Sequence, residues 1–167
     1  MITEKLRTGL HIIFVGFNPS ITSYERGFNY AGRNNRFYKV LFESGLTKRL
    51  YQPEESPNLL DDYGYGFTNI VMRPTKRADE LTAKEYAEGR VVLREKLHQY
   101  RPQIACFVGK GVYAEFSKRR QGVSWGFQTD SIVPGVQDFV GPSTSGLVRM
   151  RLDEQVRIYE ELAQAVK

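Results

Sequence analysis

Asn18 follows a stretch that predicts a buried strand, and its amide is the first candidate for chemistry in the chain. The stretch His11–Ser20 reads His-Ile-Ile-Phe-Val-Gly-Phe-Asn-Pro-Ser, and its apolar, β-branched run is typical of the centre of a parallel sheet. Gly16 allows close backbone approach and Pro19 fixes φ, so a rigid turn is expected. In open α/β sheets ligands bind beyond the carboxyl ends of strands, which places the Asn18 amide at the mouth of a candidate site. Taken alone, the stretch favours the simpler interpretation that Asn-Pro begins a turn.

Two further stretches carry side chains suited to a ligand. Gly64–Val71 predicts a short second strand with Asn69 near its end. The stretch Gly141–Arg149 holds three hydroxyl residues, two glycines and an exposed-looking Leu147. Hydroxyl and backbone N–H groups suit phosphate contacts, and an apolar residue at a loop tip can insert between bases. The alternative is a flexible Ser/Gly linker before the last helix.

Other candidate groups have simpler explanations. Asp61 and Asp62 are adjacent, so they point in different directions and favour solvent or a helix cap over paired catalysis. The glycine turn Gly109–Gly111 can cradle a phosphate, but it lacks the spacing of a Walker loop or a dinucleotide fingerprint. Cys106 fits an inert core thiol. With one cysteine and two histidines, the chain offers no metal-ligand cluster, and no cofactor is expected.

The composition predicts a single globular domain over residues 1–167. Hydrophobic residues make up 41% and charged residues 26% of the chain, which is ordinary for such a domain. The chain has 24 Lys and Arg against 19 Asp and Glu, and its net charge of +5 suits a polyanionic partner without requiring one. No apolar run approaches the ~20 residues of a membrane helix, and no signal peptide is recognised. We therefore expect a cytoplasmic protein without a membrane partner, associated with the nucleoid if its source is a bacterium.

The remaining pattern alternates strands with helices. Thr82 and Glu85 form a capping box that opens a helix ending at Tyr100, and its expected buried stripe is Tyr86, Val92, Leu93 and Leu97. Further elements are expected as helices over Arg33–Ser44, Lys110–Ser117 and Leu152–Val166, a strand over Gln103–Val108 and a β pair within Ser124–Val140. Ile21–Gly32 is expected to be a long loop whose aromatic residues form either a stacking surface or its own anchors. This order predicts an α/β fold, a three-layer α/β/α sandwich around a mainly parallel central sheet, with the candidate loops at one edge.

Four blocks occur in order along the chain: Gly16–Ser20, Asn34–Lys39, Gly66–Asn69 and Pro142–Arg149. They read Gly-Phe-Asn-Pro-Ser, Asn-Asn-Arg-Phe-Tyr-Lys, Gly-Phe-Thr-Asn and Pro-Ser-Thr-Ser-Gly-Leu-Val-Arg. In this order and spacing they resemble the mismatch-specific uracil/thymine-DNA glycosylases, a branch of the uracil-DNA glycosylase superfamily. The resemblance spans nearly the whole chain and implies a uracil-DNA glycosylase-like fold.

The resemblance implies roles for the residues of a base pocket. Asn18 would position the hydrolytic water, Tyr30 would stack on the flipped base, and the backbone of Gly16 and Phe17 would contact the base edge. Two further residues match positions that contact the base in thymine-processing members, namely Asn69 and Thr75. Asn69 stands where some bacterial members have lysine, which leaves the accepted base open.

The resemblance also implies a DNA-binding loop, made of Ser143, Ser145, Gly146, Leu147, Val148 and Arg149. Its two serines would bind the phosphates that flank the flipped nucleotide. Leu147 would fill the gap left in the base stack, with Gly146 and Val148 near the widowed guanine. The block differs from the Asn-Pro-Ser-Gly-Leu-Ser common in bacterial members, which leaves the guanine contacts open.

The activity implied by the resemblance is that of a monofunctional DNA glycosylase. Such an enzyme flips uracil out of double-stranded DNA, hydrolyses its N-glycosidic bond and leaves an abasic site. Extrusion of a base costs a few kcal/mol and less for a mispaired one, which favours mismatches with guanine. Thymine and ethenocytosine are further candidate substrates, and a monomer is expected. Two other classes stay open: a non-catalytic lesion-binding module, and a nucleotide-dependent enzyme that uses Gly109 and Lys110.

Overall fold

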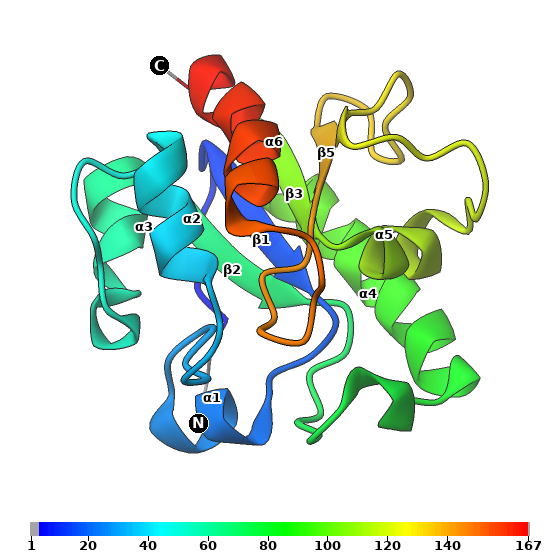
Figure 1. Cartoon of the computed structure of the whole chain (residues 1–167). Coiled ribbons are helices and arrows are strands. Elements are labelled where there is room, and N and C mark those ends of the chain that lie inside the picture. Colours follow the sequence, from blue (N-terminus) through cyan, green and yellow to red (C-terminus); the bar gives the residue numbers. More distant parts are fainter. Residues whose placement is uncertain (1–3, 167) are drawn as a thin grey trace.

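The computed structural model describes residues 4–166 and has a five-stranded sheet at its centre (Figure 1). The strands are β1 Ile12–Gly16, β2 Tyr65–Asn69, β3 Ile104–Val108, β4 Gly126–Phe127 and β5 Gln137–Gly141. They lie in the order β2-β1-β3-β5-β4, and every pair is parallel except β4 with β5. The ends of the predicted domain, residues 1–3 and 167, lie outside the described part.

Helices cover both faces of this sheet. They are α1 Ile21–Arg26, α2 Phe37–Ser44, α3 Asn58–Tyr63, α4 Ala83–Tyr100, α5 Lys110–Ser117 and α6 Leu152–Ala165, with short 3₁₀ turns at Pro53–Glu55 and Ala78–Glu80. Figure 1 shows α2, α3 and α6 on one face of the sheet and α4 and α5 on the other. The predicted three-layer α/β/α architecture is thereby confirmed.

Alternate residues of β1 belong to the two apolar layers. Ile12 and Phe14 pack with residues of α2, α3 and α6, whereas Ile13 and Val15 pack with residues of α4 and α5. All four side chains are completely buried. A strand covered on both faces has no solvent side, which explains why its sequence is an unbroken apolar run.

The chain reverses its direction of travel across the sheet at β1. It leaves β1 for β2 on one side and later returns to add β3 on the other side. In sheets of this kind, the crevice at the carboxyl ends of the strands beside such a reversal is where ligands bind. The turn that carries Asn18 starts at this point.

Three details of the secondary structure differ from the sequence-based expectation. Ile21–Gly32 is not all loop, because α1 begins after Ser20, whose Oγ accepts the Ser23 N–H (3.1 Å). The helix expected to start near Arg33 begins only at Phe37. On α4, Val92 is 47% exposed and does not join the buried stripe, because the helix rests on the sheet through a narrower face.

The other local expectations are confirmed. The Thr82–Glu85 capping box opens α4, with the Glu85 N–H donating to Thr82 Oγ1 (3.2 Å) and the Thr82 N–H to Glu85 Oε1 (3.1 Å). Cys106 is buried, and burial raises the pKa of its thiol, which fits the expected core thiol. Asp61 pairs with Arg7 at the surface, and Asp62 accepts a hydrogen bond from Tyr51.

Within residues 4–166, no helix is long and apolar enough to cross a membrane. Within the same residues, no group of histidine, cysteine or carboxylate side chains is arranged to hold a metal ion.

Asp138 is a completely buried carboxyl group at the amino end of β5. Its Oδ2 accepts hydrogen bonds from Tyr113 Oη (3.0 Å) and the Ile132 N–H (3.1 Å). Removal from water nevertheless outweighs these bonds and raises the pKa of Asp138 from 3.8 to about 6.

The substitution Asp138→Asn tests this proton linkage. Because the folded-state pKa lies above the unfolded value, the stability that the wild-type carboxyl contributes falls as the pH rises through this interval. Asparagine keeps an oxygen for Tyr113 and Ile132 but does not titrate. We expect the free energy of unfolding of D138N relative to wild type to rise by roughly 2 kcal/mol between about pH 4 and about pH 6. Urea unfolding at a series of pH values measures this difference, and a pH-independent difference would contradict the linkage.

Candidate active site

A cavity of about 400 Å³ lies at the carboxyl edge of the sheet. It is lined by most of the residues singled out from the sequence: Gly16, Phe17, Asn18, Tyr30, Asn69, Thr75, Ser143, Ser145, Gly146 and Leu147. Two of the predicted DNA-binding residues are not among its lining residues, since Val148 is half-buried beside it and Arg149 is exposed farther out. The loops that follow different strands thus converge on one edge, as expected.

The amide of Asn18 is fixed in orientation. Its Nδ2 donates to the carbonyl oxygen of Arg73 and to Thr75 Oγ1, both at 2.8 Å. A carbonyl oxygen can only accept, so the nitrogen must face Arg73. Thr75 Oγ1 donates in turn to the carbonyl oxygen of Arg77 (2.6 Å). Asn18 Oδ1 has no hydrogen-bond partner among the described residues and is available to accept from a ligand or a water molecule.

The turn after β1 also presents two backbone donors. The carbonyl groups of Gly16 and Phe17 accept from the N–H groups of Ile70 (3.0 Å) and Val71 (2.9 Å), which extends the pairing of β1 with β2. The N–H groups of Phe17 and Asn18 have no partner within residues 4–166. The turn therefore offers donors and one amide oxygen to the cavity.

Gly16 leaves space that two polar groups occupy. A Cβ atom at this position would lie 2.9 Å from Asn69 Oδ1 and 3.3 Å from Tyr30 Oη. Asn69 pairs with Gly16 in the register of β2 with β1, so its side chain follows from the strand alignment. Neither the Asn69 amide nor the Tyr30 hydroxyl forms a hydrogen bond with another described side chain or backbone group. Any side chain at position 16 would displace them.

Tyr30 is held as a flat wall of the cavity. Its ring stacks on Phe37 with centroids 4.0 Å apart and an interplanar angle of 11°. Its backbone has a φ of +53°, an uncommon conformation for a residue with a side chain and one that recurs at functional sites. Burial raises the pKa of its hydroxyl well above the ordinary range, so the group stays neutral and can donate a hydrogen bond.

The loop after β5 folds around its own hydroxyl groups. The Ser145 N–H donates to Ser143 Oγ and the Leu147 N–H donates to Ser145 Oγ, both at 3.3 Å. These turns present Leu147 at the tip with 90% of its surface exposed. An apolar side chain this exposed has no packing role in the fold.

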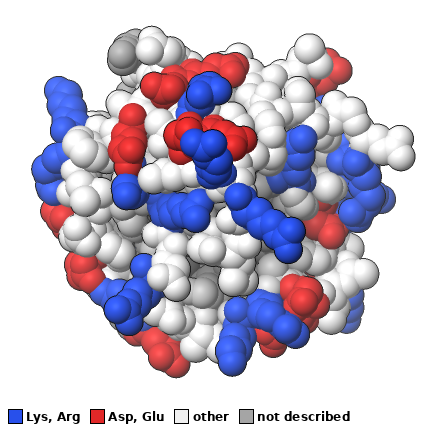
Figure 2. Space-filling view, in the orientation of Figure 1, with Lys and Arg blue, Asp and Glu red and all other residues white. Residues whose placement is uncertain are grey.

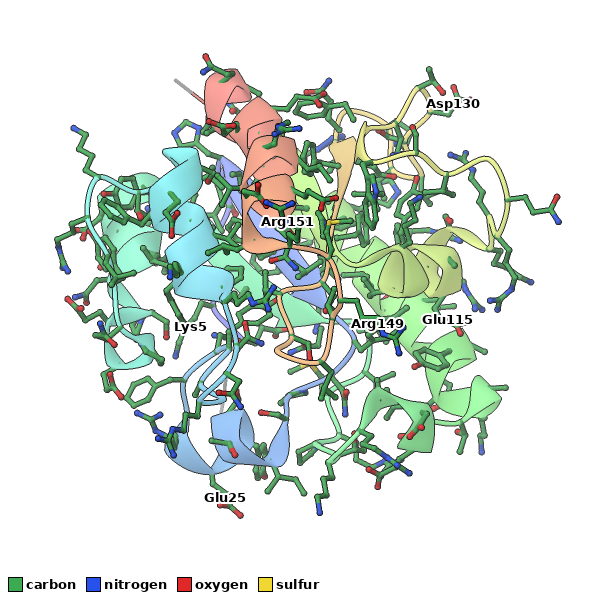
Figure 3. The ribbon with its side chains drawn as sticks, in the orientation of Figure 1. Lys5, Glu25, Glu115, Asp130, Arg149 and Arg151 are labelled. Carbon is green, nitrogen blue, oxygen red and sulfur yellow. The ribbon has the colours of Figure 1, made fainter. Side chains whose placement is uncertain are left out.

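Basic side chains lie on the face of the molecule that Figure 2 shows. Lys and Arg are spread around its centre with Asp and Glu among them, and Figure 3 shows Arg149 and Arg151 near the segment that joins the loop to α6. Lys76 is the charged residue among those that line the cavity. Together with the net charge of +5, these residues suit a polyanionic partner.

Sequence reasoning assigned no site role to several residues that line the cavity. They are Ser23, Asn34, Asn35, Lys76 and Thr144. Asn34 and Asn35 belong to one of the four ordered blocks, but the resemblance implied no role for either of them. Thr144 is 1% exposed and donates its hydroxyl to Asn35 Oδ1 (2.8 Å), a contact across 109 residues that no local pattern reveals.

The glycine turn at Gly109 does not join the site. The Gly109 N–H donates to the carbonyl oxygens of Gly141 (2.7 Å) and Phe107 (3.1 Å), so it is occupied within the fold. Lys110 Nζ lies 4.4 Å from the centre of the Trp125 ring. The turn is absent from the cavity lining, which removes the support for a nucleotide phosphate site there.

Comparison with known families agrees with this geometry. The family model for the uracil DNA glycosylase superfamily matches residues 5–167, which include all four ordered blocks and every residue of the cavity. Membership supports a DNA N-glycosylase, a hydrolase that acts on uracil-type lesions. The chain belongs to the uracil DNA glycosylase superfamily.

Proposed function

We propose that the protein is a monofunctional, mismatch-specific DNA glycosylase that flips uracil opposite guanine out of double-stranded DNA and hydrolyses its N-glycosidic bond. Superfamily membership supplies the coarser activity, and the mismatch preference is our inference. The observation that carries the proposal is the fixed amide of Asn18, with its nitrogen bound and its oxygen free inside the cavity. Thymine and ethenocytosine opposite guanine are further proposed substrates.

In the proposed reaction, Asn18 Oδ1 accepts a hydrogen bond from the attacking water. An amide is a poor base, but the sugar gains oxocarbenium character as the base departs, and positioning of water is then sufficient. As the water oxygen bonds to the sugar carbon, the C–N bond breaks with its electron pair on the base, and the proton that the water loses passes to solvent or to the departed base. The base leaves as an anion, which the N–H groups of Phe17 and Asn18 would stabilise in the manner of an oxyanion hole. No metal or cofactor takes part in this scheme.

The proposed base pocket places Tyr30 against the ring of the flipped base. Asn69 offers both a donor and an acceptor, which matches the O4 and N3–H groups on the edge of uracil. The backbone of Gly16 and Phe17 contacts the same base. Thr75 was assigned a base contact by resemblance, and its hydroxyl bonds to Asn18 and Arg77 add a role in holding the amide.

The proposed DNA contacts lie on the exposed loop. Ser143 and Ser145 bind phosphates beside the flipped nucleotide, Arg149 adds a cationic contact, and Leu147 occupies the vacated place in the stack. Gly146 and Val148 approach the opposing guanine. Leu147 restores only part of the lost stacking, so the cost of extrusion still decides which bases are flipped. This cost is lower for a base that is already mispaired than for one in a Watson–Crick pair. We propose that a monomer binds one lesion.

A panel of oligonucleotides tests the function directly. The wild type is incubated without cofactor with duplexes containing U·G, T·G, U·A or ethenocytosine, and with single-stranded uracil DNA, and abasic sites are then cleaved with alkali. Strand breaks that are strongest for U·G support the proposal. Binding to mismatched duplexes without strand breaks would instead identify a non-catalytic lesion-binding module.

The substitution Asn18→Ala removes the water-holding oxygen. Since the nitrogen of Asn18 contacts only protein groups, we expect duplex binding to remain near wild type while the single-turnover excision rate falls by about 10²-fold or more. A gel-based excision assay and a binding titration on the same U·G duplex measure both quantities. Excision at the wild-type rate would contradict the assignment.

The substitution Thr75→Val removes one of the two acceptors of the Asn18 amide and keeps the shape of the side chain. We expect a smaller loss than for N18A, about tenfold in the single-turnover rate, because the Arg73 carbonyl still holds the nitrogen. If Thr75 acts chiefly on the base, the loss would appear in the affinity for uracil instead. Measuring rate and affinity separately distinguishes these roles.

The substitution Leu147→Ala shortens the exposed side chain at the loop tip. Because Leu147 is 90% exposed, its loss should leave the melting temperature unchanged. We expect both base flipping and retention of the abasic product to weaken by about tenfold. The fluorescence of a 2-aminopurine placed next to the lesion measures the flipping. Unchanged flipping and product release would exclude insertion of Leu147 into the duplex.

A further inference from the structure

We propose that Asn35, Arg36 and Gln155 are positioning residues that lock the wedge loop, Ser143–Met150, to the wall of the base pocket. The inference rests on the proposed function, in which Leu147 inserts into the duplex. It concerns a different question, namely what holds the loop ready for insertion. The Asn34–Lys39 block was singled out in the sequence, yet neither catalysis nor base binding accounts for it.

Arg36 contacts both ends of the wedge loop. Its backbone N–H donates to the carbonyl oxygen of Thr144 (2.8 Å), near the start of the loop. Its Nη1 donates to the carbonyl oxygen of Met150 (3.0 Å), at the end of the loop. The Arg36 guanidinium forms no ion pair with a carboxylate in the described part of the chain, and its hydrogen bond there is the one to Met150.

Gln155 holds both ends of the same loop from α6. It lies in the first turn of α6 and is completely buried. Its Nε2 lies 3.4 Å from the carbonyl oxygens of both Ser143 and Met150, the first and last residues of the wedge loop. A buried amide that spans both ends fixes the width of the loop base.

Asn35 joins the loop to the stacking residue of the pocket. Its Oδ1 accepts from Thr144 Oγ1 (2.8 Å) and from the Phe37 N–H (2.9 Å). The Phe37 ring is the one on which Tyr30 stacks. A continuous chain of contacts through Asn35 and Phe37 thus links the wedge loop to the wall of the base pocket.

The tip of the loop also has no freedom to shift toward this segment. A Cβ atom on Gly146 would lie 2.6 Å from Asn34 Cβ and 2.7 Å from its carbonyl oxygen. The two segments are therefore in direct backbone contact beside Leu147. Glycine at position 146 is required by this contact, independently of any contact with DNA.

Such a brace has a physical purpose. A loop rich in serine and glycine loses much conformational entropy when it is ordered, and an exposed leucine gains nothing from the protein in return. Ordering before DNA arrives removes that cost from the binding step, which is the general advantage of preorganisation. The contacts of Asn35, Arg36 and Gln155 supply this order.

A double-mutant cycle tests the proposal. Single-turnover excision from a U·G duplex is measured for R36A, L147A and R36A/L147A. If Arg36 acts by positioning Leu147, R36A alone lowers the rate by about tenfold, and the double variant is no slower than L147A. Rate losses that multiply in the double variant would overturn the proposal. R36K, which keeps one donor, should recover part of the loss.

Two matched variants separate positioning from loss of charge and loss of fold. R151A removes the same charge from an exposed residue that pairs with Asp153, and its rate loss should show no coupling with that of L147A. A different result would identify Arg36 as a phosphate contact and contradict the proposal. In that case R36A lowers the slope of log Kd against log salt concentration for duplex binding by about 1, whereas R151A leaves this slope unchanged. Gly146→Ala removes no bond or charge but should displace the loop, and it should behave like R36A.

Hydrogen exchange provides a readout that needs no activity. In R36A and in Q155A, the amides of Ser145, Leu147 and Val148 should exchange faster, while those of β1 and β3 keep wild-type protection. Uniformly faster exchange would indicate a general loss of stability and contradict the brace. Failure of the wild type to excise any base would reject the proposed function, whereas this exchange pattern tests the brace on its own.

Discussion

The parallel pairing of β1 with β2 is the constraint on which the rest of the site depends. It places Asn69 opposite Gly16, and the bonds from Ile70 and Val71 continue the pairing beyond both strands. Because the carbonyl groups of Gly16 and Phe17 accept hydrogen bonds in this pairing, the N–H groups of the turn remain available to a ligand. A Cβ atom at position 16 would lie 2.9 Å from Asn69 Oδ1, so any other residue there would displace the Asn69 amide. The polarity of the cavity thus follows from strand register.

No carboxylate lines the cavity within residues 4–166, which suits the proposed reaction. Its polar lining includes Asn18, Asn69 and the neutral Tyr30 hydroxyl, and Lys76 adds a positive charge. A carboxylate would be a stronger base than an amide, but it would repel the departing anionic base and the nearby phosphates in a site of low dielectric. An oriented amide avoids that repulsion. Its orientation depends on the Arg73 carbonyl, so a backbone group from another segment determines which amide atom faces the cavity.

Local patterns in the sequence predicted the elements better than the contacts between them. The apolar runs of β1 and β3, the capping box at Thr82 and the exposed Leu147 all follow from nearest-neighbour chemistry and were foreseen. The helix α1 was missed because Ser20, its N-cap, was interpreted only as the end of a turn. The bond between Asn18 and Arg73 and the contact of Asn35 with Thr144 could not be foreseen, because each joins segments whose distance in space depends on the order of strands.

The meeting of the wedge loop with the Asn34–Arg36 segment follows from topology. In a parallel sheet each covering helix runs opposite to the strands, so its amino end lies at the carboxyl edge. The helices α2 and α6 cover the same face and pack against each other (Figure 1). The residues that precede the two helices are therefore brought together at that edge, although they are more than a hundred positions apart. One of these lead-in segments follows the stacking residue Tyr30 and the other carries Leu147. The packing of two helices thus sets the distance between the place where a flipped base would bind and the side chain that would replace it.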